Sequence, residues 1–404
     1  MSSLKLNGVT KTYPSGVRAL YNTDLETSDK EFLVILGGEE SGKSTLLRVI
    51  AGLEDCTAGK ILIDGKEMNE VEPKDRDIAM VFRGDALYPA LTVYDNLAFG
   101  LKIRKAQQSL IEQRVKAVSS ILGLDGVLFR KPKALTAMQK QLVALGRAVV
   151  REPKLYLFDE PLAGLDSNLK ATVLNVIINM QARMQGTFVY ATKNVGEAMT
   201  AGTRIAVFKK GVLQQTDIPA NIYDYPANAY VAFLAGAPSI NFLNDARLER
   251  RDGEVYVKEG GFEAPLPENI LSRFENVETY IAEGKSVIVG IRPEDMVAGD
   301  EGFEATVGKV ENDGEKVFAE CEFSGNNFVV SASGGLKTGD KTKLKIDFTR
   351  LYLFDKETRL TLLKRDGGYI KTGYADAEYV PPAYAEEEEI IKNSKPAKKE
   401  KKKR

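Results

Sequence analysis

A short glycine-rich stretch constrains the fold of this chain more than any other part of its sequence. It follows an apolar run at residues 31–36 and precedes a helix-like segment at residues 44–53 that ends on Gly52. A loop of the pattern G-x-x-x-x-G-K-[ST] between a strand and a helix is typical of a phosphate-binding site. The residues of this phosphate loop are Gly37, Gly38, Glu39, Glu40, Ser41, Gly42, Lys43, Ser44 and Thr45.

The loop predicts specific contacts to a nucleotide. Glycines let the backbone curl so that several N–H groups point at phosphates, and the start of the following helix adds partial positive charge. We expect Lys43 to reach the β- and γ-phosphates and Ser44 to bind Mg²⁺. Glu39 and Glu40 place two carboxylates in this loop, which weakens nucleotide binding unless both turn outward to solvent. The alternative is a glycine turn that precedes a helix without binding anything.

A second apolar segment, residues 154–158, ends in the two carboxylates Asp159 and Glu160. At the end of a strand beside the phosphate loop, Asp159 would complete the Mg²⁺ shell and Glu160 would polarise an attacking water. The alternative is a buried strand followed by a solvated acidic turn.

Composition excludes several function classes. The 404 residues carry 56 basic and 57 acidic side chains, for a net charge of −1, which argues against a general nucleic-acid binder. The chain contains no histidine, so a Ser-His-Asp triad and a histidine-ligated zinc site are excluded. No apolar run approaches the roughly 18 residues that cross a bilayer, and no signal peptide is evident. We expect a cytosolic protein of several domains.

Residues 1–235 alternate between short strands and helical segments, which predicts an α/β domain with a largely parallel sheet. Its residues 87–150 are helical in pattern, and residues 204–215 predict a hairpin turned at Lys210-Gly211. Residues 236–365 predict a small all-β, barrel-like domain, entered through a linker at Ala237-Pro238 and residues 241–243. Residues 366–404 predict a disordered charged tail, either a plain solvated tail or a contact for anionic lipid or RNA.

These elements, in this order, resemble the nucleotide-binding subunit of ATP-binding-cassette (ABC) transporters, in particular the maltose-type carbohydrate importers. The resemblance covers residues 1–365 and rests also on segments 76–82, 86–89, 91–96, 144–148 and 291–295. It implies a P-loop NTPase cassette with a helical subdomain, followed by an OB-like regulatory domain. It also implies ATP and Mg²⁺ as cofactors, with two cassettes closing head to tail on two ATP molecules. Tyr13 would stack on adenine, and Asp166 would act in the loop that communicates across the dimer.

The chain departs from that family at positions that the resemblance assigns to catalysis and to contact across the dimer. The family's signature loop, Leu-Ser-Gly-Gly-Gln, is here Leu135, Thr136, Ala137, Met138 and Gln139. Arg83 replaces a glutamine, and it either clamps phosphate or pairs with Glu160. Lys193 replaces the switch histidine that contacts the γ-phosphate, and Ala90 replaces a further histidine. Met138 would crowd the opposite phosphate, so we expect ATP to be bound but hydrolysed slowly or not at all.

Two main functions remain open at this point. The first is the ATP-binding subunit of an importer, peripheral on the inner face of the cell membrane, docked on a permease and paired with a second cassette. The second is a catalytically weak or inactive nucleotide-binding regulatory subunit. A cassette protein acting on ribosomes or DNA is disfavoured, because such proteins usually carry two cassettes or long coiled-coil insertions, and we expect no nucleic-acid partner.

Overall fold

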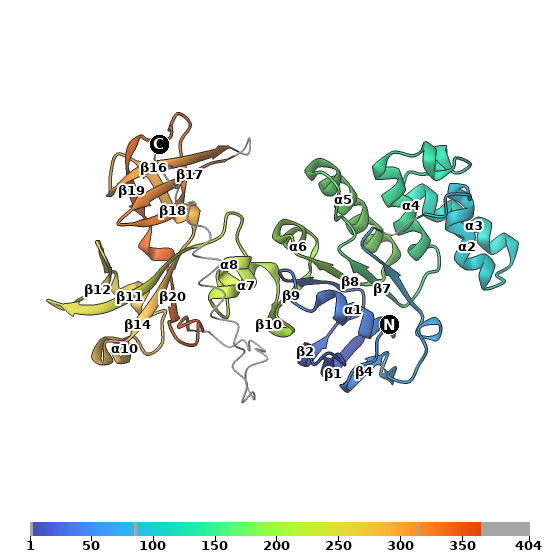
Figure 1. Ribbon diagram of the computed structural model, residues 1–404, viewed down its shortest axis with the longest axis horizontal. Coiled ribbons are helices and arrows are strands. Elements are labelled where there is room, and N and C mark those ends of the chain that lie inside the picture. The colour runs from blue at the N-terminus through green and yellow to red at the C-terminus, as the bar shows by residue number, and fades with distance from the viewer. Residues whose placement is uncertain (1–2, 85–86, 313–315, 365–404) are drawn as a thin grey trace, which may run out of the picture. The chain divides into compact units, whose positions relative to one another are not determined.

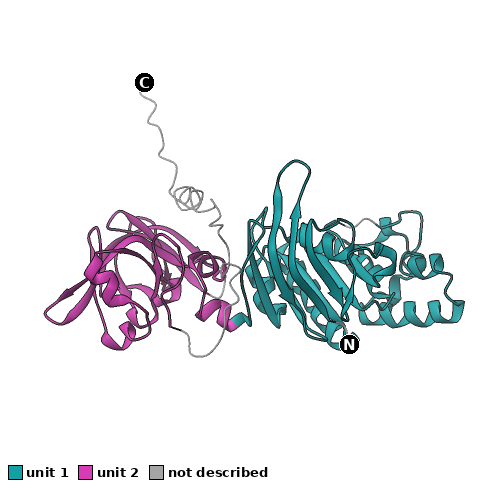
Figure 2. Ribbon diagram, turned by 90° about the horizontal axis from the view of Figure 1, so that it is seen from below, with its two compact units in different colours: residues 1–219, 371–373 teal, residues 220–370, 374–404 magenta. Residues whose placement is uncertain are grey.

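The computed structural model describes residues 3–84, 87–312 and 316–364 (Figure 1). The chain divides into two compact units, the first ending at Pro219 and the second beginning at Ala220 (Figure 2). No helix of the described residues combines the length and the apolar character needed to span a bilayer.

The centre of unit 1 is a six-stranded sheet of order β10-β9-β3-β8-β7-β6. All its neighbours pair in parallel except β9 and β10, which form the expected hairpin at Lys210-Gly211. Strands β3, β7 and β8 are buried at every residue, as is usual for parallel strands covered on both faces. The strands are β3 (Phe32–Leu36), β6 (Ile78–Val81), β7 (Leu155–Asp159), β8 (Thr187–Thr192), β9 (Arg204–Lys209) and β10 (Val212–Asp217).

Helices of unit 1 agree with the patterns predicted from the sequence. The phosphate loop leads into α1, which ends at Gly52 in the left-handed conformation. The expected helical segment between residues 87 and 150 is confirmed, and α3 buries Ile111, Val115 and Val118 at helical spacing. The helices are α1 (Lys43–Ala51), α2 (Val93–Ile103), α3 (Gln108–Ile121), α4 (Ala137–Val149), α5 (Ser167–Met184) and α6 (Val195–Ala201).

A second, antiparallel sheet in unit 1, of order β2-β1-β4-β5, was not anticipated from the sequence. Its inward side chains share one apolar core with α1 and the parallel sheet, including Leu6, Leu33 and Leu47. This sheet therefore helps to fix α1 and the phosphate loop that precedes it. Its strands are β1 (Leu4–Thr12), β2 (Arg18–Glu26), β4 (Ala58–Ile63) and β5 (Lys66–Glu67).

Unit 2 is rich in strands, as expected. It contains a five-stranded sheet of order β13-β12-β11-β14-β20 and a closed barrel of order β15-β18-β17-β16-β19. The sheet strands are β11 (Asn241–Arg251), β12 (Glu254–Glu259), β13 (Phe262–Leu266), β14 (Ser286–Ile291) and β20 (Tyr352–Asp355). The barrel strands are β15 (Met296–Gly299), β16 (Phe303–Asn312), β17 (Val317–Phe323), β18 (Asn326–Ala332) and β19 (Lys341–Ile346). Four short α-helices of the described residues accompany these strands: α7 (Pro219–Asp224), α8 (Ala229–Leu234), α9 (Glu268–Leu271) and α10 (Val277–Glu283).

The expected linker at residues 241–243 is wrong, because these residues begin β11, where Asn241 pairs with Ile291 of β14. The division between the units also falls earlier than the expected boundary at residue 235. The reason is the buried Arg292 guanidinium, which donates hydrogen bonds to the carbonyl oxygens of Ala232 (2.9 Å) and Tyr223 (2.7 Å). These contacts tie α7 and α8 to the second unit. The tail expected at residues 366–404 lies outside the described residues.

The turn between β9 and β10 packs closely against β2, and this gives a test of the fold. A Cβ on Gly211 would lie 2.4 Å from the carbonyl oxygen of Ala19, whereas a Cβ on Gly65 would meet nothing within 4 Å. Both glycines have positive φ, +80° and +74°. Gly65→Ala should cost about 1 kcal/mol of unfolding free energy from backbone strain alone. Gly211→Ala should cost about 1–3 kcal/mol more, because the clash adds overpacking. Denaturant unfolding measures both, and equal losses would contradict this account.

Candidate functional site

The phosphate loop curls between β3 and α1, as the sequence predicts. Gly42 has φ +90° at the start of α1, and a Cβ there would lie 2.5 Å from the carbonyl oxygen of Ala19. A Cβ on Gly37 would lie 2.5 Å from the carbonyl oxygen of Phe208. The backbone N–H of Gly211 donates to the carbonyl oxygen of Ser41 at 3.0 Å. The loop thus takes a path that only glycine permits at these positions, and the β9–β10 turn holds it in place.

Lys43 lies inside this loop with 5% of its side chain exposed. Its ammonium donates to the carbonyl oxygens of Gly37 (2.9 Å) and Gly38 (2.7 Å) and to Ser41 Oγ (3.1 Å). Burial lowers the pKa of Lys43, and the nearby carboxylates of Glu160 and Asp159 oppose that shift. The ammonium is therefore positioned at the centre of the loop, where the phosphates of a nucleotide are expected.

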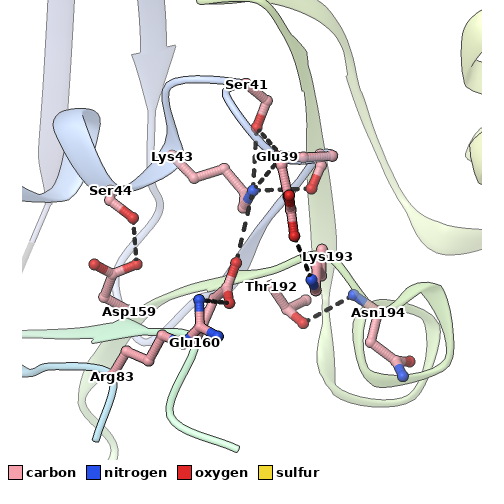
Figure 3. A network of polar contacts seen from close by, with 12 residues as sticks. Glu39, Ser41, Lys43, Ser44, Arg83, Asp159, Glu160, Thr192, Lys193 and Asn194 are labelled. Atoms are coloured by element: carbon pink, nitrogen blue, oxygen red, sulfur yellow. Dashed lines mark hydrogen bonds and ion pairs between the residues drawn. The ribbon is translucent and has the colours of Figure 1, made fainter. Parts of the chain in front are cut away.

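Ser44 and Asp159 meet as predicted. Ser44 Oγ donates to Asp159 Oδ1 at 2.8 Å, across a separation of more than a hundred residues (Figure 3). Burial raises the pKa of Asp159, the hydrogen bond from Ser44 lowers it, and the charge of Glu160 raises it further. A hydroxyl beside a carboxylate supplies the hard oxygen ligands that Mg²⁺ prefers, with phosphates and water completing its shell. These two residues fit the ion.

Glu160 lies between two cations (Figure 3). Its carboxylate is 3.9 Å from the ammonium of Lys43 and 3.6 Å from the guanidinium of Arg83. Its backbone has φ +44°, a conformation unusual outside glycine, and its N–H donates to the carbonyl oxygen of Ala191. Of the two alternatives stated for Arg83, the structure shows the pairing with Glu160.

Lys193 follows β8 and faces the phosphate loop. Its ammonium donates to Glu39 Oε1 at 2.8 Å, and both side chains are largely exposed. This contact raises the pKa of Lys193 and lowers the pKa of Glu39. The other loop glutamate, Glu40, is exposed and has φ +59°. Both glutamates are exposed, and of the two Glu39 pairs with a cation.

Tyr13 reaches the other end of the phosphate loop. Its hydroxyl donates to Glu54 Oε2 at 2.6 Å and lies 3.2 Å from Thr45 Oγ1. Burial and the hydrogen bond to Glu54 raise the pKa of Tyr13, so the phenol stays neutral. The hydroxyl thus lies beside the loop residue Thr45, and the resemblance implies that the Tyr13 ring would stack on adenine.

Asp166 and the positions of the signature loop begin helices. Asp166 is exposed and accepts a hydrogen bond from the backbone N–H of Leu169 at the start of α5. Leu135 is buried, and Thr136 and Gln139 form a reciprocal capping box at the start of α4. Ala137 and Met138 occupy the first turn of α4, with Ala137 exposed and Met138 half-buried.

Sequence reasoning missed two residues that support the site. Glu54 fixes the hydroxyl of Tyr13, and no local pattern indicates that pairing. Glu197 is buried and accepts hydrogen bonds from Thr192 Oγ1 (2.6 Å) and the hydroxyl of Tyr190 (2.9 Å). Its backbone N–H binds the side chain of Asn194, which begins α6. The spacing of Asn194 and Glu197 is a helix-start signal that was readable from the sequence.

Substitution of Tyr13 tests its expected contact with adenine. Tyr13→Ala should weaken binding of a fluorescent adenine nucleotide about 5- to 30-fold, because stacking on an aromatic ring contributes about 1–2 kcal/mol. Tyr13→Phe keeps the ring and loses only the contacts to Glu54 and Thr45, so its affinity should stay within about twofold of wild type. If both variants lose the same affinity, the hydroxyl contacts rather than the ring determine binding.

Comparison with known proteins agrees with this geometry. Residues 20–163 match the family model described as ABC transporter, and residues 236–296 match the MalK OB fold domain. The chain is 41% identical over 367 residues to the uncharacterized ABC transporter ATP-binding protein YurJ of Bacillus subtilis (strain 168), covering 89% of this chain and 99% of the relative. It is 39% identical over 372 residues to the oligosaccharides import ATP-binding protein MsmX of the same bacterium, covering 90% and 100%.

A third relative and a solved structure extend the comparison. The osmoprotective compounds uptake ATP-binding protein GgtA of a Synechocystis species is 39% identical over 368 residues, covering 88% of this chain and 98% of the relative. The structure of cbiO1 from Clostridium perfringens, part of the ABC transporter complex cbiONQ, has a TM-score of 0.51 and 27% identity, covering 54% of this chain and 89% of that one. The chain therefore belongs to the family of ABC transporter ATP-binding proteins, with a P-loop cassette followed by a MalK-type OB-fold domain.

Proposed function

We propose that this chain is the energising subunit of an importer for carbohydrates or chemically similar solutes. It docks on membrane permease subunits at the inner face of the membrane, pairs with a second cassette and binds ATP with Mg²⁺. The near full-length similarity to an oligosaccharide importer subunit and to an osmoprotectant uptake subunit supports this class of solute. We propose further that hydrolysis is slow, and the observation that carries this is the contact between Arg83 and Glu160.

The residues of the phosphate loop are suited to hold ATP without major rearrangement. Lys43 exchanges its loop carbonyl partners for the β- and γ-phosphates, and the curled backbone supplies further N–H donors. Ser44 and Asp159 would hold Mg²⁺, which supplies charge neutralisation on the phosphates when bound. Glu160 stands next to Asp159 at the end of β7 and is the base that would orient the attacking water.

Arg83 interferes with that last role. A carboxylate acts on water only when one of its oxygens is free to accept the water proton. Glu160 Oε2 lies 3.6 Å from the Arg83 guanidinium, and Oε1 lies 3.9 Å from Lys43, so at each oxygen a cation at ion-pair distance competes with water. Guanidinium has no acceptor and keeps its charge, so it cannot replace the water-positioning function of a glutamine amide. ATP binding is thus preserved while the chemical step is weakened.

Pairing with an intact cassette would restore only part of the activity. The composite site that uses this chain's phosphate loop would gain a normal signature loop but keep Arg83 and Lys193. The other composite site would have intact catalytic groups but meet Met138 of this chain in place of a glycine. A methionine side chain cannot permit the close backbone approach that glycine allows. Both sites of such a pair would work below the usual rate.

Removing the guanidinium tests this proposal. Arg83→Gln should raise steady-state phosphate release from Mg-ATP by about tenfold, a part of the 10²–10⁴ that a general base contributes. Glu160→Gln and the double variant should both stay at background. Lys60→Gln removes another exposed, ion-paired cation of unit 1 and should leave the rate unchanged. Wild-type release already at the rate of an intact cassette would overturn the proposal of slow hydrolysis.

A transport assay distinguishes the importer subunit from the alternative, a regulatory subunit without turnover. In cells that depend on this chain for uptake of a carbohydrate, Glu160→Gln should abolish uptake while the protein still copurifies with its permease, because binding is kept and the base is lost. Uptake that survives Glu160→Gln would favour the regulatory subunit, since a subunit that does not hydrolyse ATP does not need this carboxylate.

A further inference from the structure

The ion pair between Glu39 and Lys193 joins two segments that are far apart in sequence. Glu39 belongs to the phosphate loop, and Lys193 follows β8. The ammonium nitrogen lies 2.8 Å from the carboxylate oxygen, a charge-assisted hydrogen bond (Figure 3). The pair therefore connects the end of β8 to the phosphate loop that holds Lys43.

Both ends of this link are anchored. Thr192, which precedes Lys193, is buried and donates its hydroxyl to Glu197 at 2.6 Å. The backbone N–H of Asn194, on the other side, donates back to Thr192 Oγ1 at 3.0 Å. On the loop side, Ser41 accepts a hydrogen bond from Lys43. Both side chains of the pair are exposed, so they can separate while the hydrogen bonds of Thr192 and Ser41 stay in place.

Lys193 directly follows β8 and contacts the phosphate loop through Glu39, in the same loop as Lys43 (Figure 3). Lys43 is the residue expected to reach the β- and γ-phosphates, and Glu160 the one expected to face the attacking water. An ammonium can donate to a γ-phosphate oxygen, which a diphosphate lacks.

We propose that Glu39 is a built-in stand-in for the γ-phosphate. Its carboxylate binds the Lys193 ammonium in the absence of a triphosphate, and a nucleoside triphosphate must displace it to gain the same contact. Glu39 and Lys193 are then specificity-determining residues that set the preference for a triphosphate over a diphosphate. This inference rests on the proposed function, because it assumes that the loop binds adenine nucleotides.

The neighbouring Glu40 offers a matched control. It carries the same charge in the same loop and is also exposed, but within the described residues it forms no ion pair, and it does not contact Lys193. A simple loss of negative charge near phosphates should favour both nucleotides alike. Only the loss of a competing carboxylate should favour the triphosphate selectively.

The experiment measures dissociation constants of ADP and of the β,γ-imido analogue of ATP with Mg²⁺, on the full chain. Glu39→Gln should raise the ratio of triphosphate to diphosphate affinity about two- to fivefold, the range typical of an exposed ion pair. Glu40→Gln should leave this ratio unchanged. Lys193→Gln should lower the ratio, and adding Glu39→Gln to it should produce no further selective gain. Thermal unfolding confirms that each variant is folded.

Two results would overturn the inference while leaving the proposed function intact. One is an equal change of the ratio in Glu39→Gln and Glu40→Gln, which would show that charge alone acts. The other is a selective gain from Glu39→Gln that persists in the absence of the Lys193 ammonium. A folded wild-type chain that binds neither nucleotide at millimolar concentration would instead overturn the proposed function and this inference with it.

Discussion

The site depends on one buried cation. Lys43 loses its hydration inside the phosphate loop. This burial is tolerated because two carbonyl oxygens and a hydroxyl accept hydrogen bonds from its ammonium. Those acceptors fix the curl of the loop, and the curl in turn requires the glycines that approach the carbonyls of Ala19 and Phe208. The parallel sheet, the β9–β10 turn and the antiparallel sheet all act as supports for this arrangement.

The charged side chains around Lys43 form ion pairs. Two further cations lie near the loop, and each meets a carboxylate: Arg83 meets Glu160 and Lys193 meets Glu39. Repulsion between the three cations is thereby offset by neighbouring anions. Within the loop, Glu39 is engaged by Lys193, whereas Glu40 is exposed.

The sequence predicted the elements whose signals are local. The phosphate loop, the acidic end of β7 and the β9–β10 turn each follow from a few adjacent residues, and the structure confirms them. The antiparallel sheet escaped prediction because β4 pairs with β1 from a distant part of the sequence, although β1 and β2 themselves form a local hairpin. The start of β11 was taken for a linker because Asn241 and its neighbours carry a weak strand pattern. The contact between Glu39 and Lys193 was beyond reach, since it depends on where β8 lies next to β3.

Arg292 has a practical consequence for dividing the molecule. Its guanidinium packs 3.9 Å from the ring centre of Tyr223 and donates to two carbonyl oxygens of the segment that contains α7 and α8. A fragment cut at residue 236 would strip this buried cation of both acceptors and of the ring. A fragment begun at Ala220 keeps them all. A fragment for expressing the OB-fold unit alone, or for exchanging it between relatives, should therefore begin no later than the first residues of α7.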